Sequence, residues 1–293
     1  MRLAFFIAAF TSSVFAQESL DLQIRQIAAD AQGTVSVACS LPHTYLDCDL
    51  NPTARPPMQS VFKLPLAMTV MQQVEAGKFA LNQHILFQPE DLILPKPYSP
   101  LQDKYPYAGA EVPLETLLEM TVSLSDNTAA DILLRVAGGP KSVNGYIASL
   151  GVSGFHLQDG ERALHHDRAL QYRNWFEPRG AVQLLRTISD HSPLTREHTQ
   201  LLLNWMSSSK ITSRICGKLP DGTVVAHKTG TSDVDNGLAA ATNDIGLITL
   251  PDGQQLAIAV FVTNSAADEN TRDTVIARIS RAVYDYASKS LKR

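Results

Sequence analysis

A serine and a lysine three positions apart, in the segment Ser60-Val61-Phe62-Lys63, begin a long apolar run of this 293-residue chain. In a helix these two side chains share one face. A serine hydroxyl becomes an effective nucleophile only when a neighbouring base takes its proton, and a desolvated lysine is one such base. The same spacing recurs at Ser207 and Lys210, but there no apolar helix is expected to follow. We therefore predict Ser60 as the nucleophile and Lys63 as its partner.

Two further short motifs follow along the chain. Ser125-Asp126-Asn127 comes after a predicted helical run, and Lys228-Thr229-Gly230 ends a predicted strand. Taken alone, the first is also consistent with a helix cap and the second with a lysine facing solvent on an edge strand. Glycine at the end of a strand, however, lets a ligand lie close to the backbone. With Ser60 and Lys63, these motifs predict a site that combines a nucleophile, hydroxyl and amide groups, and a cation.

The three motifs together resemble the serine-reactive motifs of class A β-lactamases and penicillin-binding proteins. The likeness extends over essentially the whole mature chain and includes Gln59 before the serine, and it points to the extended-spectrum PER/VEB-like branch. The segments that carry the likeness to this branch are Asn236-Gly237-Leu238-Ala239-Ala240-Ala241-Thr242-Asn243-Asp244, Gln171-Tyr172-Arg173-Asn174-Trp175 and Arg214.

This resemblance implies a serine β-lactamase that hydrolyses the amide bond of penicillins and cephalosporins through an acyl-enzyme and confers antibiotic resistance. It implies that Ser60 loses its proton to Lys63 or, through a water, to Glu161, and that Ser125 relays a proton to the leaving nitrogen. The backbone N–H groups of Ser60 and Thr231 would form the oxyanion hole. The implied substrate-binding residues are Tyr98, Asn127, His165, Arg214, Lys228, Thr229, Gly230 and Thr231, with Arg214 presenting its guanidinium to the substrate carboxylate.

A base that hydrolyses the acyl-enzyme separates a β-lactamase from a penicillin-binding protein. In class A enzymes this base is a glutamate on a long loop, four residues before an asparagine, and the segment 156–178 offers Glu161 at that spacing from His165. His165 and Asp131 both stand where most of the family has asparagine, as in the PER/VEB-like branch. The alternatives are a D-Ala-D-Ala carboxypeptidase or another penicillin-binding protein, and a β-lactam sensor domain that stays acylated. Glu161 argues against both.

Other chemistries find less support in the composition. His165, His166 and Asp167 are consecutive, so they do not converge as spaced metal ligands do, and we expect no metal and no cofactor. The chain has 25 basic and 29 acidic residues, a net charge of −4, and no long run of either sign. Nucleic acid and anionic membrane surfaces are therefore not expected partners. The family resemblance implies that small-molecule β-lactams are the substrates.

The N-terminus resembles a secretory signal. Residues 1–16 combine Arg2, an apolar segment too short to span a bilayer and a small-residue cleavage site at Ala16, so we expect a monomer exported to the periplasm. An oxidising compartment favours disulfides. Cys39 and Cys48 lie in two predicted strands, 34–40 and 45–50, where a hairpin would either pair them or leave two buried thiols. Cys216 would remain free and buried.

The elements that position these residues follow from the hydrophobic pattern. The segment from Val61 to Val74 is apolar nearly all round, which places its helix in the centre of the protein. Helices are also expected over 113–137, 140–150 and 179–206 and at the C-terminus, with strands near 223–229, 237–250 and 255–263. We predict an α+β fold, in which an antiparallel sheet formed from both chain ends (17–58 and 207–293) is flanked by helices. An all-helical subdomain (59–206), including a loop over 156–178, is inserted between them.

Overall fold

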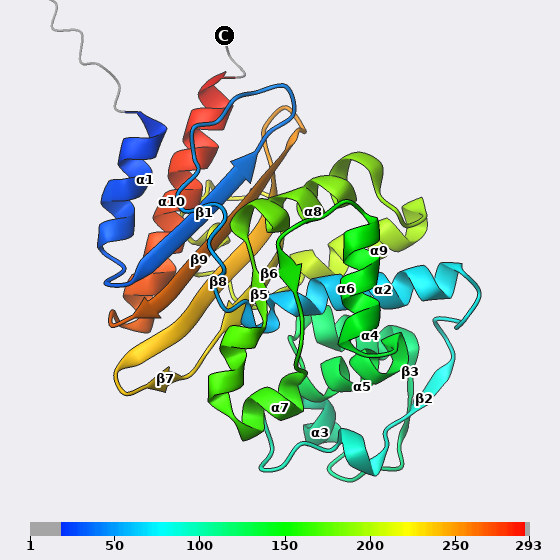
Figure 1. Cartoon of the computed structure of the whole chain (residues 1–293). Helices are drawn as coiled ribbons and strands as arrows, with labels where there is room; N and C mark the ends of the chain where they lie inside the picture. Colours follow the sequence, from blue (N-terminus) through cyan, green and yellow to red (C-terminus); the bar gives the residue numbers. More distant parts are fainter. Residues whose placement is uncertain (1–18, 291–293) are drawn as a thin grey trace, which may run out of the picture.

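Five antiparallel strands from the two ends of the chain form the central sheet. The structure is a computed structural model that describes residues 19–290, so the predicted signal segment, residues 1–16, lies outside the described residues. The sheet has the order β1-β9-β8-β6, and β7 pairs with β8 (Figure 1). Its strands are β1 (Thr34–Ser40), β6 (Val225–Thr231), β7 (Val234–Asp235), β8 (Leu238–Thr249) and β9 (Gln255–Ser265). This arrangement confirms the predicted α+β fold.

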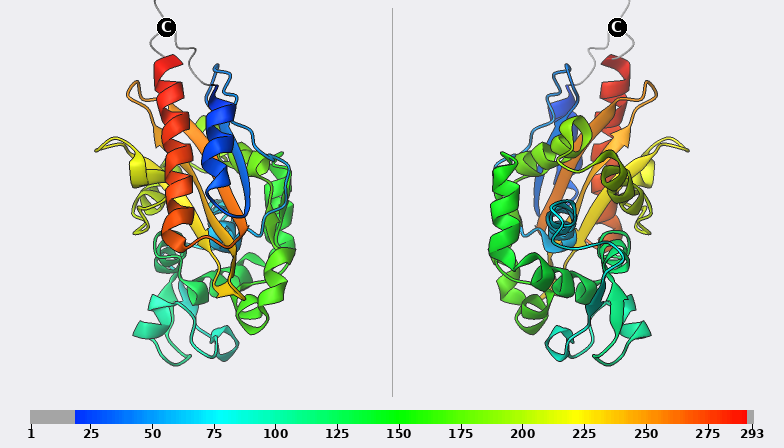
Figure 2. Two further views of the ribbon diagram at one scale, coloured as in Figure 1. Left: turned by 90° about the vertical axis from the view of Figure 1, so that its left-hand side faces the viewer. Right: turned by 90° about the vertical axis from the view of Figure 1, so that its right-hand side faces the viewer.

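Helices cover both faces of this sheet. On one face α1 (Leu20–Ala29) and α10 (Glu269–Ser290) lie side by side, as Figure 2 shows, and α10 packs on β8 and β9. On the other face α8 (Pro178–His191) packs against β1 and β9. The central strands β8 and β9 are buried almost throughout, which explains why their sequences are nearly continuous apolar runs instead of alternating ones.

The middle of the chain is organised around α2 (Lys63–Glu75), whose residues from Lys63 to Met71 are all buried. The surrounding helices are α3 (Pro100–Lys104), α4 (Leu114–Ser123), α5 (Asn127–Ala137), α6 (Pro140–Ser149), α7 (Glu161–His166) and α9 (Arg196–Ser207). This segment is not all-helical as predicted. It also contains two small sheets, formed by β2 (His84–Leu86) with β3 (Glu111–Pro113) and by β4 (Phe155–His156) with β5 (Trp175–Phe176).

Two long predicted helices are each divided in the structure. The run 113–137 forms α4 and α5, which are separated by residues 124–126, and the run 179–206 forms α8 and α9. Within the first break, Asp126 caps α5 by accepting a hydrogen bond from the backbone N–H of Ala129 (2.8 Å). The break therefore presents Ser125 between two helices, a geometry that one continuous helix would prevent.

The predicted loop over 156–178 contains more structure than expected. It includes α7, the 3₁₀ helix η3 (Arg168–Arg173) and β5. The side chain of Asn174 closes it: its Oδ1 accepts from the backbone N–H groups of Gln158 (2.8 Å) and Asp159 (3.0 Å), and its Nδ2 donates to the Asp159 carbonyl (2.8 Å). These bonds join the two ends of the segment, so α7 is carried on a closed loop.

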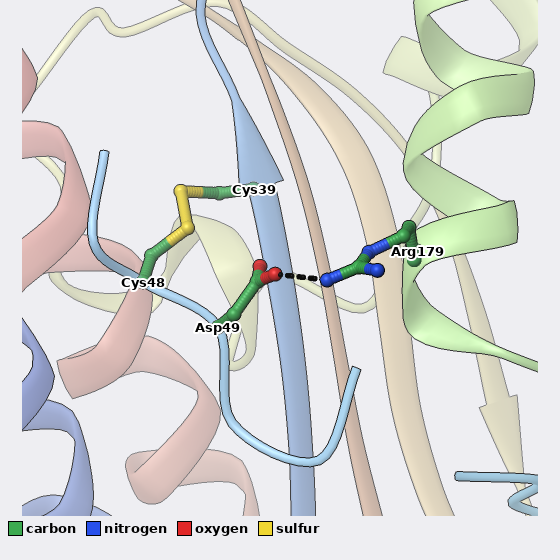
Figure 3. Close-up of a disulfide and its surroundings, with 4 residues drawn as sticks. All are labelled: Cys39, Cys48, Asp49 and Arg179. Atoms are coloured by element: carbon green, nitrogen blue, oxygen red, sulfur yellow. Dashed lines mark hydrogen bonds and ion pairs between the residues drawn. A yellow bond between two sulfur atoms is a disulfide. The ribbon is translucent and has the colours of Figure 1, made fainter. Parts of the chain in front are cut away.

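The predicted second strand of the N-terminal hairpin was wrong. Residues 45–50 make only an isolated bridge, in which Leu50 pairs with Val37. Cys39 and Cys48 are nevertheless joined by a disulfide, with their Cα atoms 6.1 Å apart (Figure 3). Next to it, Asp49 forms an ion pair with Arg179 of α8 at 2.9 Å. Residues 45–50 are thus attached to β1 by a disulfide and to α8 by an ion pair.

Three further 3₁₀ helices complete the described elements: η1 (Gln59–Phe62), η2 (Pro89–Asp91) and η4 (Ile215–Lys218). Within residues 19–290, no helix is both long enough and apolar enough to cross a membrane.

Candidate active site

Ser60 lies in η1, directly before α2, and opens onto a cavity of about 880 Å³. The residue before it, Gln59, has φ +47°, a left-handed conformation that is costly for a side chain other than glycine. Such backbone strain is found where surrounding structure forces a functional geometry. Here it turns the chain so that the serine faces the cavity at the start of the buried helix.

A connected polar cluster lies behind Ser60. The Ser60 hydroxyl donates to Oε1 of Glu161 (3.4 Å), and the ammonium of Lys63 contacts the same oxygen at 2.8 Å. Lys63 is fully buried and also donates to the backbone carbonyl of Ser125 (2.7 Å) and to Oδ1 of Asn127 (2.6 Å). One carboxylate oxygen thus connects the predicted nucleophile and the predicted base.

Lys228 places a second cation on the far side of Ser125. Its ammonium donates to the Ser125 hydroxyl at 3.0 Å and to the carbonyl of Thr229 at 3.1 Å. Burial, and after it the nearby charge of Lys63, lowers the pKa of Lys228 to about 7. The hydroxyl of Ser125 lies between two lysines, because Lys63 also approaches it, at 3.5 Å.

The segment around residue 98 holds the second motif in place. Ser125 itself has φ +58°, and Asp126 next to it accepts hydrogen bonds from the Ser99 hydroxyl (2.9 Å) and the Leu101 N–H (2.6 Å). The backbone N–H of Asn127 donates to the carbonyl of Tyr98 (3.3 Å). Burial raises the pKa of Asp126, and these hydrogen bonds oppose that rise. Tyr98 is thereby fixed to the motif, and its exposed ring lines the cavity.

Glu161 is positioned by Asp131 of α5. The two carboxylate oxygens of Asp131 accept from the backbone N–H groups of Glu161 and Arg162, both at 2.7 Å, at the N-terminus of α7. A Cβ at Gly160 would lie 2.6 Å from Oδ1 of Asp131, so only glycine permits this approach. Burial, and next the charge of Glu161, raises the pKa of Asp131 to about 7. The aspartate at this position therefore anchors the helix that carries Glu161.

Gly230 permits another close approach. A Cβ there would lie 2.5 Å from the carbonyl oxygen of Met58, just before the nucleophile segment. The Asn243 side chain of β8 donates to the carbonyls of Pro57 (2.9 Å) and Met58 (3.3 Å). Strand β6 is thus held against η1, which places Thr231 opposite Ser60 across the cavity.

Arg214 does not lie where the sequence analysis placed it. Its side chain is 1% exposed, does not line the cavity and donates to Asp273 of α10 at 2.8 Å. Its other nitrogens donate to the carbonyls of Gly230 (3.2 Å) and Asn243 (3.0 Å) and to the Thr231 hydroxyl (2.8 Å). The guanidinium therefore supports the cavity wall from behind instead of facing a ligand, because α10 supplies its carboxylate partner.

The cavity gathers most of the predicted residues. It is lined by Ser60, Tyr98, Ser125, Asn127, Glu161, His165, Lys228, Thr229 and Thr231, while Lys63 and Gly230 lie directly behind its wall. The second serine–lysine pair is divided: Ser207, at the end of α9, lies outside the cavity, whereas Lys210 lines it. Sequence reasoning missed Lys210 as a cavity residue, and also Lys96, Arg168, Asp233 and Asp235, because nothing in their local sequence marks them.

Metal ligands are not part of this arrangement. Across the described part of the chain, no group of three or more histidine, cysteine, aspartate or glutamate side chains is placed to hold a metal ion.

The family model described as the beta-lactamase enzyme family matches residues 19–287. This chain is a β-lactamase family member. It is 39% identical to the extended-spectrum β-lactamase PER-1 of Pseudomonas aeruginosa over 92% of this chain and 87% of that protein. It is 34% identical to the β-lactamase VEB-1 of the same organism, over 92% and 90%.

Solved structures agree with this assignment. An ancestral class A β-lactamase superposes with a TM-score of 0.82 at 30% identity, over 92% of this chain and 100% of the other. The chain is thus a class A β-lactamase with extended-spectrum relatives, and it hydrolyses β-lactam antibiotics.

Proposed function

We propose that this β-lactamase opens the β-lactam ring by acylation of Ser60 and releases the product with Glu161 as the base. The observation that carries the proposal is the position of the Glu161 carboxylate, 2.8 Å from Lys63 and 3.4 Å from the Ser60 hydroxyl. A general base must lie within hydrogen-bond reach of the proton that it removes, or reach it through one water. Glu161 meets this distance requirement for the nucleophile, which supports it as the base for a hydrolytic water as well.

In acylation, the Ser60 oxygen forms a bond to the β-lactam carbonyl carbon as its proton passes to the Glu161–Lys63 pair. The negative oxygen of the tetrahedral intermediate lies between the backbone N–H groups of Ser60 and Thr231, which donate to it. The close contact of Gly230 with the Met58 carbonyl supports this role, since it holds the strand bearing Thr231 against the nucleophile segment.

The ring then opens when its C–N bond breaks and the nitrogen takes a proton. Ser125 delivers this proton, because its hydroxyl lies 3.0 Å from the ammonium of Lys228 and 3.5 Å from that of Lys63. Lys228, Thr229 and Thr231 bind the substrate carboxylate, and Asn127 binds the side-chain amide. Arg214 acts through Thr231, to whose hydroxyl it donates, as a positioning residue.

In deacylation, Glu161 takes a proton from a water as that water attacks the ester carbon. The ester C–O bond to Ser60 breaks, and the serine oxygen recovers a proton. Tyr98 and His165 line the cavity at its mouth and contact the substrate side chain. The cavity volume of about 880 Å³ supports penicillins and cephalosporins as substrates.

The test is the substitution Ser60→Ala. It should abolish hydrolysis of nitrocefin and any covalent adduct visible by intact-protein mass spectrometry, because Ser60 is the serine in contact with Glu161. An adduct elsewhere, for example on Ser207, would overturn the assignment. In the parent, repeated turnover is expected, whereas a single stoichiometric burst would favour a penicillin-binding protein or a sensor.

Cellular placement is part of the same proposal. We propose that residues 1–16 are removed as a signal peptide and that the mature protein acts in the periplasm as a monomer. We also propose that its α/β and helical subdomains meet at residues 58 and 206. The disulfide between Cys39 and Cys48 supports an oxidising compartment.

A further inference from the structure

Behind the active site, on the opposite side of β6, three side chains form a second polar cluster. Cys216 belongs to η4, His227 to β6 and Asp244 to β8. Nδ1 of His227 lies 2.9 Å from both carboxylate oxygens of Asp244, and its Nε2 lies 3.7 Å from the sulfur of Cys216. His227 and Asp244 are buried, whereas Cys216, which was predicted to be buried, is half-buried. Cys216, His227 and Asp244 are thus connected in the order nucleophile, base and group that orients the base.

The surroundings fix the orientation of the imidazole. One oxygen of Asp244 also accepts from the backbone N–H of Ile215 (3.1 Å), which ties the start of η4 to β8. Opposite His227 in the sheet stands Gly246, where a Cβ would lie 2.7 Å from the Cβ of His227. The carboxylate therefore faces Nδ1, and Nε2 is left for the sulfur.

The imidazole of His227 is held in an environment that favours its charged form. Although burial opposes it, the carboxylate of Asp244 raises the pKa of His227 to about 10. A protonated imidazole next to a sulfur stabilises the thiolate, which is the reactive form of cysteine. This cluster takes no part in the β-lactam chemistry proposed above.

We propose that Cys216 is a reactive thiol that forms mixed disulfides with small disulfide compounds, and that this modification switches the β-lactamase off. In the reaction the Cys216 sulfur bonds to one sulfur of the reagent, the S–S bond of the reagent breaks, and the second sulfur leaves as a thiolate. The proton of Cys216 is taken up by the leaving thiolate or by solvent. No other oxidant is required, because the disulfide reagent is itself reduced.

Two residues near Cys216, Arg214 and His227, connect a modification of its sulfur to the wall of the active-site cavity. Arg214, two positions before Cys216, donates to the carbonyl of Gly230 and to the hydroxyl of Thr231. His227 is the neighbour of Lys228 on β6. Because the sulfur lies against the buried imidazole, a group added to it has to displace either η4 or the ring. Either displacement moves a residue that supports the wall of the cavity.

The cysteine content makes the site simple to follow. The chain has three cysteines, and two of them form the disulfide, so Cys216 is the one thiol that can react. The probe is 2,2′-dithiodipyridine at pH 6, with release of thiopyridone measured over time. At this pH an ordinary thiol with a pKa near 8.5 is only about 0.3% ionised. Contact with the His227 imidazole, offset by lower nucleophilicity of a stabilised thiolate, should make Cys216 react about tenfold or more faster than such a thiol.

The matched variant is His227→Asn, whose amide nitrogen can still donate to Asp244 but which has no group facing Cys216. We expect it to react at least tenfold more slowly than the parent. A measurement that needs no variant compares the folded parent with the same protein unfolded in urea, where the folded thiol should react faster. Equal rates in the parent and the folded variant, or a folded thiol slower than the unfolded one, would overturn the proposal.

Hydrolysis provides the second readout. Nitrocefin turnover by the parent should fall by at least tenfold as the adduct forms, whereas a Cys216→Ser variant should keep its turnover in the reagent. Complete adduct formation without loss of turnover would overturn the switch. Thiopyridone release does not depend on the roles of Ser60 and Glu161, so failure of the proposed mechanism would be seen separately.

Discussion

Replacing Glu161 with glutamine tests the proposed mechanism at its central contact. The amide keeps the size of the side chain and its reach toward Ser60 and Lys63, which lie 3.4 Å and 2.8 Å from the carboxylate oxygen. It removes the group that takes the proton. Lys63 keeps two other partners, the Ser125 carbonyl and the Asn127 side chain, so the buried ammonium remains solvated by protein.

The magnitude follows from the loss of one base. General base catalysis contributes about 10²–10⁴-fold, or roughly 3–5 kcal/mol of activation free energy. Of the carboxylates that line the cavity, Glu161 is the one in hydrogen-bond contact with Ser60, so deacylation should lose this full amount. Acylation should lose less, because Lys63, once its ammonium has given up a proton, can still take the proton of Ser60 as a neutral amine. The acyl-enzyme on Ser60 should therefore accumulate.

The assay is rapid-quench mass spectrometry of Glu161→Gln with a slow cephalosporin, together with steady-state hydrolysis. The control is Asp167→Asn, a change in an exposed carboxylate of the same loop that lies outside the cavity lining. This control should hydrolyse substrate like the parent. The reasoning is refuted if Glu161→Gln turns over substrate like the parent with no adduct, and Asp159 and Asp167 would then be examined as bases.

Three other outcomes follow from the structure. The pKa of Lys228 is lowered to about 7, so its charge is lost as pH rises through 7, and kcat/KM should fall there. In Lys228→Arg this fall should move to higher pH, and an unchanged pH profile of kcat/KM would contradict the role of Lys228. Gly230→Ala should lower hydrolysis and destabilise the fold by about 1–3 kcal/mol, because the added Cβ would lie 2.5 Å from the Met58 carbonyl oxygen. Unchanged nitrocefin turnover and an unchanged urea unfolding midpoint would disprove the close contact. Replacing Cys39 and Cys48 with alanine should lower the free energy of unfolding in urea by roughly 3 kcal/mol, because a short covalent loop is lost. Equal unfolding midpoints in the parent and the variant would show that the bridge does not form.

The residues found by local motifs lie together at one cavity, as the sequence predicted, while their catalytic roles remain proposals. Ser60 and Lys63 belong to one helical turn, and Ser125 and Asn127 flank a helix cap, so a few neighbouring residues determine how they are presented. The central position of α2 followed from its continuous apolar composition. Strands β8 and β9 followed in the same way.

Features that depend on distant partners were not predictable. Arg214 turns away from the cavity because Asp273, 59 positions later, supplies its carboxylate. Residues 45–50 have the composition of a strand, yet only Leu50 forms a backbone bridge with β1. The helical turns of 156–178 depend on the side chains of Asn174 and Asp131, which bind backbone groups of that segment. Hydrophobic periodicity contains no information on such contacts.

Helix α5 combines two duties within one turn. Asn127 at its start reaches Lys63, and Asp131 one turn later holds the backbone of Glu161. The two side chains that contact Lys63 and the backbone of Glu161, residues proposed for acylation and deacylation, are therefore held on one short helix, about 6 Å apart along its axis. When thermal motion tilts or shifts this helix, both groups travel with it and keep their spacing. A movement of α5 therefore shifts the contact with Lys63 and the contact with the Glu161 backbone together.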